Sequence, residues 1–170
     1  WLPTYLARTF AVPFSRLGGL ALIPWVATFA ASNAAGWAAD RMRACGVSPG
    51  TIRKTLQSLA FAGGALPLLV LPSVTSPGAA ISLVSLSAAC SGVGLAAFGV
   101  NHLDVGPRYA GVLMGVSNTV ATIPGIVGVA AAGFILRATG SFAAVFYVIA
   151  AVYLIGLFGY DLWASGEQKL

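Results

Sequence analysis

Charged residues are scarce in this chain, and their scarcity excludes most classes of soluble protein. Of 170 residues, 8% are charged, compared with about 25% in soluble globular domains. At the same time, 58% are hydrophobic and the mean hydropathy is +0.90. A soluble domain of this length is unable to bury so much apolar surface. The composition therefore predicts a protein that is embedded in a lipid bilayer.

Cysteine and histidine are also rare, which limits the chemistry that the chain supports. Cys45 and Cys90 fall in a predicted loop and a predicted helix, so no disulfide or metal-binding spacing is present. His102 is the only histidine, and Ser117 has no histidine in its own hydrophobic block. A membrane-embedded hydrolase needs a nucleophile with a base, or a set of metal ligands, at one depth. We therefore expect no catalytic residue, no metal and no cofactor, and we predict that the chain is not an enzyme.

Long hydrophobic blocks are what the chain has in abundance. Each is as long as the roughly 20 residues that cross the hydrocarbon core of a bilayer. The blocks cover approximately residues 17–39, 51–72, 78–100, 109–136 and 141–165. Ser-Pro-Gly at 48–50 and 76–78, and Gly-Pro at 106–107, suit helix starts, because proline in a first turn loses no hydrogen bond. We expect an all-α integral membrane protein whose five crossing helices form one antiparallel bundle.

The first ten residues form a sixth apolar stretch that is too short to span. Trp1, Pro3 and Tyr5 are typical of the interfacial end of a helix, and no charged region of a signal peptide precedes them. We expect the body of this helix to lie upstream, so that the chain is a fragment of a longer protein.

Basic residues give the chain a net charge of +5. A nucleic-acid-binding surface is one explanation, but membrane topology accounts better for their distribution, because basic loops stay on the cytoplasmic side. Placing the 40–54 loop inside leaves three basic residues outside, namely Arg8, Arg16 and Arg137. The six on the inside are Arg41, Arg43, Arg53, Lys54, Arg108 and Lys169.

The 109–136 block carries a stripe of small and polar residues at helical spacing. These positions are Gly111, Gly115, Asn118, Thr122, Gly125, Val129 and Ala132. Because polar groups are costly in lipid, this face should turn toward other helices or a water-filled path. Close packing and a transport path both remain open. If the path is correct, Asn118, Ser117 and Thr122 are candidate substrate contacts.

A second stripe of small residues runs through the 78–100 block. It consists of Ser85, Ala89, Gly92, Ala96 and Gly99. Here helix packing is the favoured interpretation, since small side chains let helices approach closely. Ser91 lies beside this stripe and is kept as a further candidate substrate contact.

The loop after the first block reads Gly36, three residues, Asp40, Arg41, one residue, Arg43. This spacing resembles the signature loop of the major facilitator superfamily. The resemblance implies that Gly36, Asp40, Arg41 and Arg43 belong to a gate that holds the inner side closed. An aspartate at a helix end is able to pair with arginine or with a helix N-terminus, which suits such a role.

A narrower resemblance rests on several segments together. These segments resemble the solute carrier 17 group of anion transporters. They are Asn101-His102-Leu103-Asp104 with residues 107–110, residues 115–119, residues 124–128, Arg53, Lys54, Gln57 and residues 164–167. Residues 1–5 and 160–163 are most similar to plant and algal phosphate transporter 4 members. The resemblance implies that residues 1–170 form the C-terminal half of the carrier, from the end of helix seven through helix twelve. It also implies a missing N-terminal half and a location in the plastid envelope or another organelle membrane.

The function that this resemblance implies is alternating-access transport of a small anion, coupled to Na⁺ or H⁺. Inorganic phosphate, ascorbate and glutamate remain open, and the principal substrate and coupling residues belong to the missing half. Asn118 is similar to a polar substrate contact in helix eleven, and its amide NH₂ suits an anionic oxygen. The alternative is a non-transporting structural or assembly subunit, which leaves the Asp40 loop and the 101–118 run unexplained.

Residues 101–109 are expected at the inner membrane boundary, away from the central cavity. There His102 serves either a structural or gating hydrogen bond or a proton relay. The spacing of Asp104 and Arg108 predicts a local cap and ion pair, and the resemblance adds both residues to the inner gate.

Overall fold

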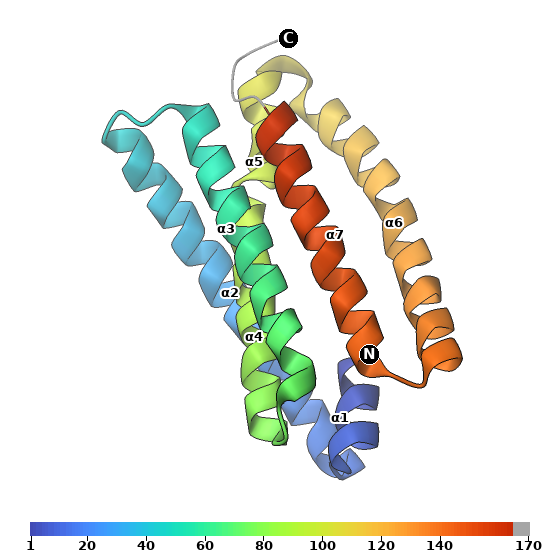
Figure 1. The fold of residues 1–170 in the computed structure, drawn as a ribbon. Coiled ribbons are helices and arrows are strands. Elements are labelled where there is room, and N and C mark those ends of the chain that lie inside the picture. Colours follow the sequence, from blue (N-terminus) through green and yellow to red (C-terminus); the bar gives the residue numbers. More distant parts are fainter. Residues whose placement is uncertain (165–170) are drawn as a thin grey trace.

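The computed structural model describes residues 1–164, and these fold into a bundle of long helices (Figure 1). The predictions for Lys169 and for residues 165–167 therefore concern positions outside the described residues. The α-helices are α1 (Leu2–Phe10), α2 (Phe14–Ala44), α3 (Pro49–Val70), α4 (Pro77–Val93), α5 (Phe98–Val105), α6 (Ala110–Thr139) and α7 (Phe142–Trp163). Three short 3₁₀ turns lie between them, namely η1 (Leu71–Ser73), η2 (Gly94–Ala96) and η3 (Pro107–Tyr109).

Within residues 1–164, five helical segments are long and apolar enough to cross a membrane. They cover residues 14–44, 49–73, 77–105, 107–139 and 142–163. The predicted all-α membrane architecture with five crossings is confirmed. The third segment is longer than predicted, because residues 101–105, which include Asp104, continue it as α5.

Helix boundaries follow from the predicted local signals. The Ser48 hydroxyl accepts a hydrogen bond from the Thr51 N–H at 3.3 Å at the start of α3, and the Ser76 hydroxyl accepts one from the Ala79 N–H at 3.2 Å at the start of α4. A proline follows each capping serine in the first turn, where its missing N–H costs nothing. At the other end of α6, Gly140 adopts φ 65°, a left-handed conformation that glycine tolerates best.

Helices α2, α3, α4 and α7 form the packed centre of the bundle. A Cβ atom on Gly92 of α4 would lie 2.8 Å from the Thr28 carbonyl oxygen of α2, so the two backbones are in close contact. The Ser87 hydroxyl of α4 donates to the Gly64 carbonyl oxygen of α3 at 2.7 Å. The packing interpretation of the 78–100 stripe is thus confirmed at Gly92.

Helix α6 lies at the edge of the bundle (Figure 1). Near its end, Ala132 and Leu136 pack against Val145 of α7, whereas most of its length is exposed. A Cβ on Gly111 or Gly125 would meet no atom within 4 Å. Among residues 1–164 the predicted small and polar stripe is therefore packed against another helix only at Ala132, and the rest of the stripe is open to a path.

The basic residues separate toward the two ends of the bundle as the topology predicts. The end that holds the α2–α3 loop and the end of α7, at the top of Figure 1, is called the basic end. It carries Arg41, Arg43, Arg53, Lys54 and Arg108. Arg8, Arg16 and Arg137 lie toward the opposite end, with α1 and the α6–α7 turn.

Candidate functional site

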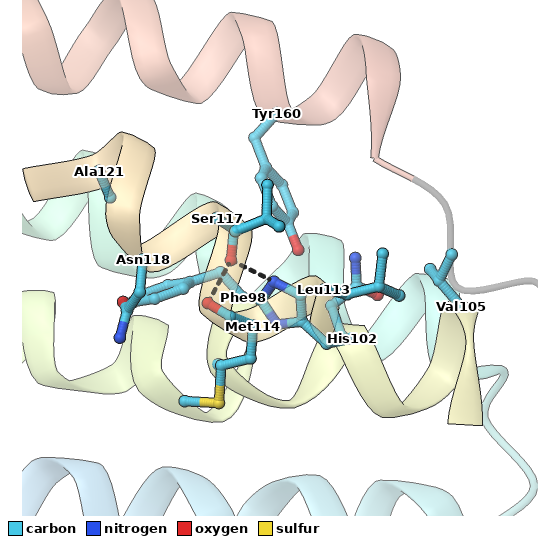
Figure 2. A pocket seen from close by; sticks show the side chains of 12 residues that line it. Phe98, His102, Val105, Leu113, Met114, Ser117, Asn118, Ala121 and Tyr160 are labelled. Atoms are coloured by element: carbon cyan, nitrogen blue, oxygen red, sulfur yellow. Dashed lines mark hydrogen bonds between the residues drawn. The ribbon is translucent and has the colours of Figure 1, made fainter. Parts of the chain in front are cut away.

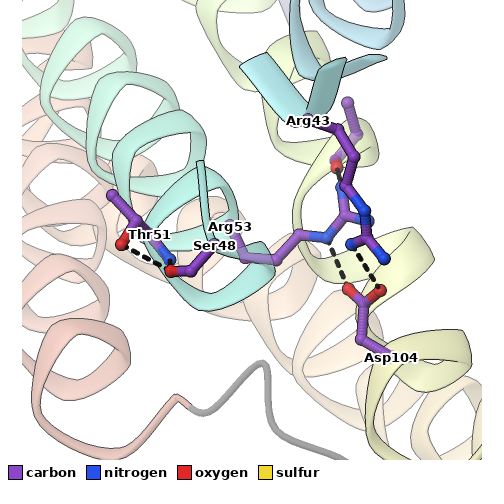
Figure 3. A network of polar contacts seen from close by, with 6 residues as sticks. Arg43, Ser48, Thr51, Arg53 and Asp104 are labelled. Atoms are coloured by element: carbon purple, nitrogen blue, oxygen red, sulfur yellow. Dashed lines mark hydrogen bonds and ion pairs between the residues drawn. The ribbon is translucent and has the colours of Figure 1, made fainter. Parts of the chain in front are cut away.

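A buried ion pair joins three segments at the basic end. Arg53, in the second turn of α3, is only 9% exposed. Its Nε donates to Asp104 Oδ2 of α5 at 2.7 Å, and the Arg43 guanidinium of α2 lies 3.9 Å from the other carboxylate oxygen. Figure 3 shows both arginines directed at the same carboxylate. The end of α2, the start of α3 and the end of α5 are therefore held together by one charged cluster.

The same arginine stabilises a break in the third membrane segment. Between α4 and α5, the η2 turn and the backbone of Ala97 (φ −98°, ψ −84°) interrupt the helix. Such a break frees carbonyl groups that need a partner when they are buried. The Arg53 Nη1 donates to the Ala96 carbonyl oxygen at 2.6 Å. Arg53 thus connects the helix break to the ion pair with Asp104.

The structure corrects the predicted ion pair between Asp104 and Arg108. Helix α5 ends at Val105, and Gly106 (φ −148°, ψ 75°) redirects the chain before η3, so the two residues do not share a helix. Arg108 is exposed, while Asp104 pairs with Arg53. The sequence predicted for Arg53 only a place among the inner basic residues and a part in the family resemblance. The signal that was available is its position on the apolar face of a membrane helix, between Ile52 and Leu56.

The predicted gating loop contributes unequally to this cluster. Arg43 reaches Asp104, whereas Arg41 and Asp40 are exposed and form no ion pair with another residue among positions 1–164. Gly36 and Asp40 line a cavity of about 340 Å³ that also borders Arg53. The structure therefore brings Gly36 and Asp40 near the cluster without including them in its ion pairs.

A second polar site lies between α5, α6 and α7 (Figure 2). The cavity has a volume of about 610 Å³. Its polar lining residues are Asn101, His102, Ser117, Asn118 and Tyr160. His102 Nε2 and Ser117 Oγ are 2.8 Å apart, which forms a hydrogen bond between α5 and α6. His102 therefore lines a cavity within this bundle, and its expected distance from the central cavity of the whole carrier stays a prediction.

The position of His102 follows from the helical period of α5. Residues 98, 101, 102 and 105 occupy one face of that helix, and all four line the cavity. Asp104 lies on another face, where it meets Arg53. One short helix thus presents its histidine to the cavity and its aspartate to the ion pair.

The four candidate substrate contacts fall in three places. Asn118 and Ser117 line the 610 Å³ cavity together. Thr122 is one turn further along α6, and its hydroxyl donates to the Asn118 backbone carbonyl oxygen at 2.9 Å. Ser91 lies at the interface of α4 and α7, where its hydroxyl is 2.7 Å from that of Tyr153. The structure brings two of the four together and separates the others from them.

Comparison with known proteins places this geometry in context. No protein-family model matches the chain. All 170 residues align at 38% identity with the ascorbate transporter, chloroplastic, of Arabidopsis thaliana, over 31% of its length. They align at 36% identity with the probable anion transporter 4, chloroplastic, of Oryza sativa subsp. japonica, over 29% of its length. The sodium-dependent phosphate transport protein 1, chloroplastic, of Arabidopsis thaliana is 34% identical over 168 residues, which are 99% of this chain and 33% of that protein.

The chain is homologous to the plant anion transporters. The resemblance to anion carriers of the major facilitator superfamily is therefore confirmed. The chain spans about a third of the length of these transporters, which is consistent with a six-helix C-terminal part.

The 610 Å³ cavity contains two residues for which the sequence predicted no role. They are Asn101 and Tyr160, which belong to two of the segments that resemble the transporter family. Asn101 Oδ1, the Tyr160 hydroxyl and His102 Nδ1 are buried and have no hydrogen-bond partner among residues 1–164. Buried polar groups normally have partners, so these three atoms are available to a bound polar species. The signal for Tyr160 was weak, since a tyrosine near the end of a membrane helix is common at the interface.

Proposed function

We propose that this chain is the C-terminal half of a secondary active transporter of small anions. Two observations support the proposal. The relatives are named as transporters of anions, ascorbate and phosphate. Within this bundle, Asn118 and Ser117 line a polar cavity between otherwise apolar helices. The cavity between α5, α6 and α7 is the part of the substrate site that this half contributes.

The chemistry of the cavity suits a phosphate or a carboxylate. The Asn118 amide is able to donate hydrogen bonds to anionic oxygens without bringing a second charge into the membrane, whereas the Ser117 hydroxyl beside it bonds His102 and Met114. Inorganic phosphate, ascorbate and glutamate are the substrates to compare, with Na⁺ or H⁺ as the coupling ion. The names of the relatives favour the plastid envelope as the membrane. Thr122 and Ser91 stay predicted contacts.

The charged cluster at the basic end serves as the gate in this proposal. Alternating access requires contacts that form in one state of the carrier and break in the other. The cluster of Arg43, Arg53 and Asp104 joins α2, α3 and the broken α4–α5 segment, so its opening would release α5. The remaining predicted gating residues are exposed or line the neighbouring cavity, where they are able to meet the other half. They are Gly36, Asp40, Arg41 and Arg108.

Transport by the full-length carrier in proteoliposomes tests the proposal. Uptake of phosphate, ascorbate and glutamate is measured with and without Na⁺ and H⁺ gradients. For the anion that is transported, Asn118→Ala should raise KM about tenfold, since a hydrogen bond to a charged group contributes about 1.5–3 kcal/mol. Thr119→Ala is the matched control. Thr119 lies on the same helix, and its hydroxyl donates to the backbone carbonyl oxygen of Gly115 one turn earlier.

The outcomes separate the competing interpretations. An unchanged KM in Asn118→Ala would remove Asn118 from the substrate site. Absence of uptake for every anion would favour the structural or assembly subunit. Residues 1–170 alone should transport nothing, because a half-carrier has no opposite wall to the cavity.

A further inference from the structure

We propose that His102 binds a proton together with the transported anion, so that protonation of this imidazole and occupation of the cavity stabilise each other. The inference rests on the proposed function and specifies its coupling ion. It is carried by the geometry of the imidazole, the absence of a competing charge in the described lining, and the unpartnered atoms around it.

The imidazole has one nitrogen engaged and one nitrogen free. Nε2 bonds to the Ser117 hydroxyl at 2.8 Å, and that hydroxyl also donates to the Met114 carbonyl oxygen at 3.2 Å. Ser117 has a single hydroxyl hydrogen. When this hydrogen points to Met114, Nε2 must carry its own hydrogen and donate it to Ser117. Nδ1 is then a buried lone pair, which has no partner among residues 1–164 and is able to accept a proton.

In the second arrangement the Ser117 hydrogen points to Nε2, and Nδ1 carries a hydrogen that lacks an acceptor. A gained proton then goes to Nε2, as the Ser117 hydrogen turns to the Met114 carbonyl oxygen, and Nδ1 is again the unpartnered atom. In both cases Nδ1 needs a group that the described residues do not supply. An anionic oxygen satisfies a protonated Nδ1 in either arrangement, and the Tyr160 hydroxyl in the same cavity is a second unpartnered donor for it.

No fixed charge among the described cavity-lining residues replaces the anion. That lining contains no Asp, Glu, Lys or Arg. Around α5, the η2 turn and residues 110–121 of α6 also carry no titratable side chain. The surrounding elements hold Asp104, which pairs with Arg53 beside Arg43, and the exposed Arg108 and Tyr109. On α3 and α7 they hold Lys54, which bonds the Asp161 carbonyl oxygen, Asp161, which accepts from Ser58, Tyr153, which bonds Ser91, and Tyr160.

The anion is therefore the counter-charge that the imidazolium requires. Burial disfavours a lone imidazolium, and an opposite charge within about 4–6 Å favours it. The proton that the imidazole gains when the anion enters returns to water when the anion leaves on the other side. By linkage, a proton that strengthens anion binding is itself bound more strongly in the presence of the anion.

The test compares pH profiles of the full-length carrier and its His102→Gln variant in proteoliposomes. Glutamine keeps a hydrogen-bond partner for Ser117 but does not titrate. The wild-type KM for the transported anion should rise as the pH increases from 5.5 to 8, by up to tenfold per pH unit for one coupled proton. In His102→Gln this dependence should flatten, and a pH gradient should no longer drive accumulation.

Two further measurements keep the result interpretable. Since the anion titrates identically for both proteins, the difference between their profiles reports His102. Thr119→Ala should retain the wild-type slope. Binding of the anion to the detergent-purified wild-type carrier in weak buffer near neutral pH should take up protons, and the uptake should be absent in His102→Gln.

An equal pH slope in both proteins, or anion binding without proton uptake in the wild type, would overturn the role of His102 and leave anion transport standing. Failure of every anion to be transported or bound would instead overturn the proposed function.

Discussion

Replacing Arg53 with methionine is expected to destabilise the basic end of the bundle, because it leaves the Asp104 carboxylate without its principal partner. The two side chains are 11% and 12% exposed, and their closest atoms are 2.7 Å apart. Removing one partner of a buried pair costs about 3–5 kcal/mol. Arg43 lies 3.9 Å away and is 56% exposed, so it compensates only weakly. We expect a loss of about 3 kcal/mol for Arg53→Met, close to the lower limit of that range.

A double-mutant cycle isolates this interaction. Arg53→Met, Asp104→Leu and the double variant are compared by thermal unfolding of the detergent-purified full-length carrier. Each single variant should lower the apparent Tm. The double variant should lose less stability than the two single variants lose together, with a coupling energy of about 2–3 kcal/mol. The bond from Arg53 to the Ala96 carbonyl oxygen is lost in both Arg53 variants and cancels in the cycle.

Arg41→Met is the matched control for this cycle. Arg41 is exposed at the same end of the bundle, so its substitution should change stability by less than about 0.5 kcal/mol. Strictly additive effects of the Arg53 and Asp104 substitutions would refute the reasoning, because they would show that the pair contributes no interaction energy.

Two further predictions concern the packed centre of the bundle. Gly92→Ala places a Cβ 2.8 Å from the Thr28 carbonyl oxygen and should cost about 1–3 kcal/mol in thermal unfolding, whereas Gly19→Ala, where a Cβ meets nothing within 4 Å, should be neutral or stabilising. Equal losses for both would contradict the close approach of α2 and α4. Tyr153→Phe and Ser91→Ala each remove the 2.7 Å hydroxyl contact and should lower stability by about 1 kcal/mol. A KM that rises in Ser91→Ala alone would support the predicted substrate contact there.

The membrane-spanning segments were predictable because their signals are local. Hydropathy over about 20 residues and a Ser-Pro pair at a helix start act within a few turns of the chain. The break at η2 was not predicted, since Gly94, Leu95 and Ala96 have the same composition as their unbroken surroundings. What supports the break is Arg53, which lies 43 residues away in the sequence.

The cavity was predicted only in part. The helical spacing of α6 singled out Asn118, with Ser117 added as its polar neighbour, because periodicity identifies a face before its neighbours are known. The same spacing did not show which residues of other helices face them. His102 and Tyr160 reach the cavity from α5 and α7, and no pattern within either helix indicates that meeting.

The sequence by itself determined the membrane class, the five crossings, the distribution of basic residues between two ends and the family resemblance. These properties depend on hydropathy, local capping and motif spacing, which need no knowledge of distant contacts. Only the tertiary structure decided that Asp104 pairs with Arg53 in place of Arg108, and that His102 faces the cavity. Both outcomes depend on the direction in which one short helix, α5, presents its two polar faces, and that direction is set by the packing of α5 against α3 and α6.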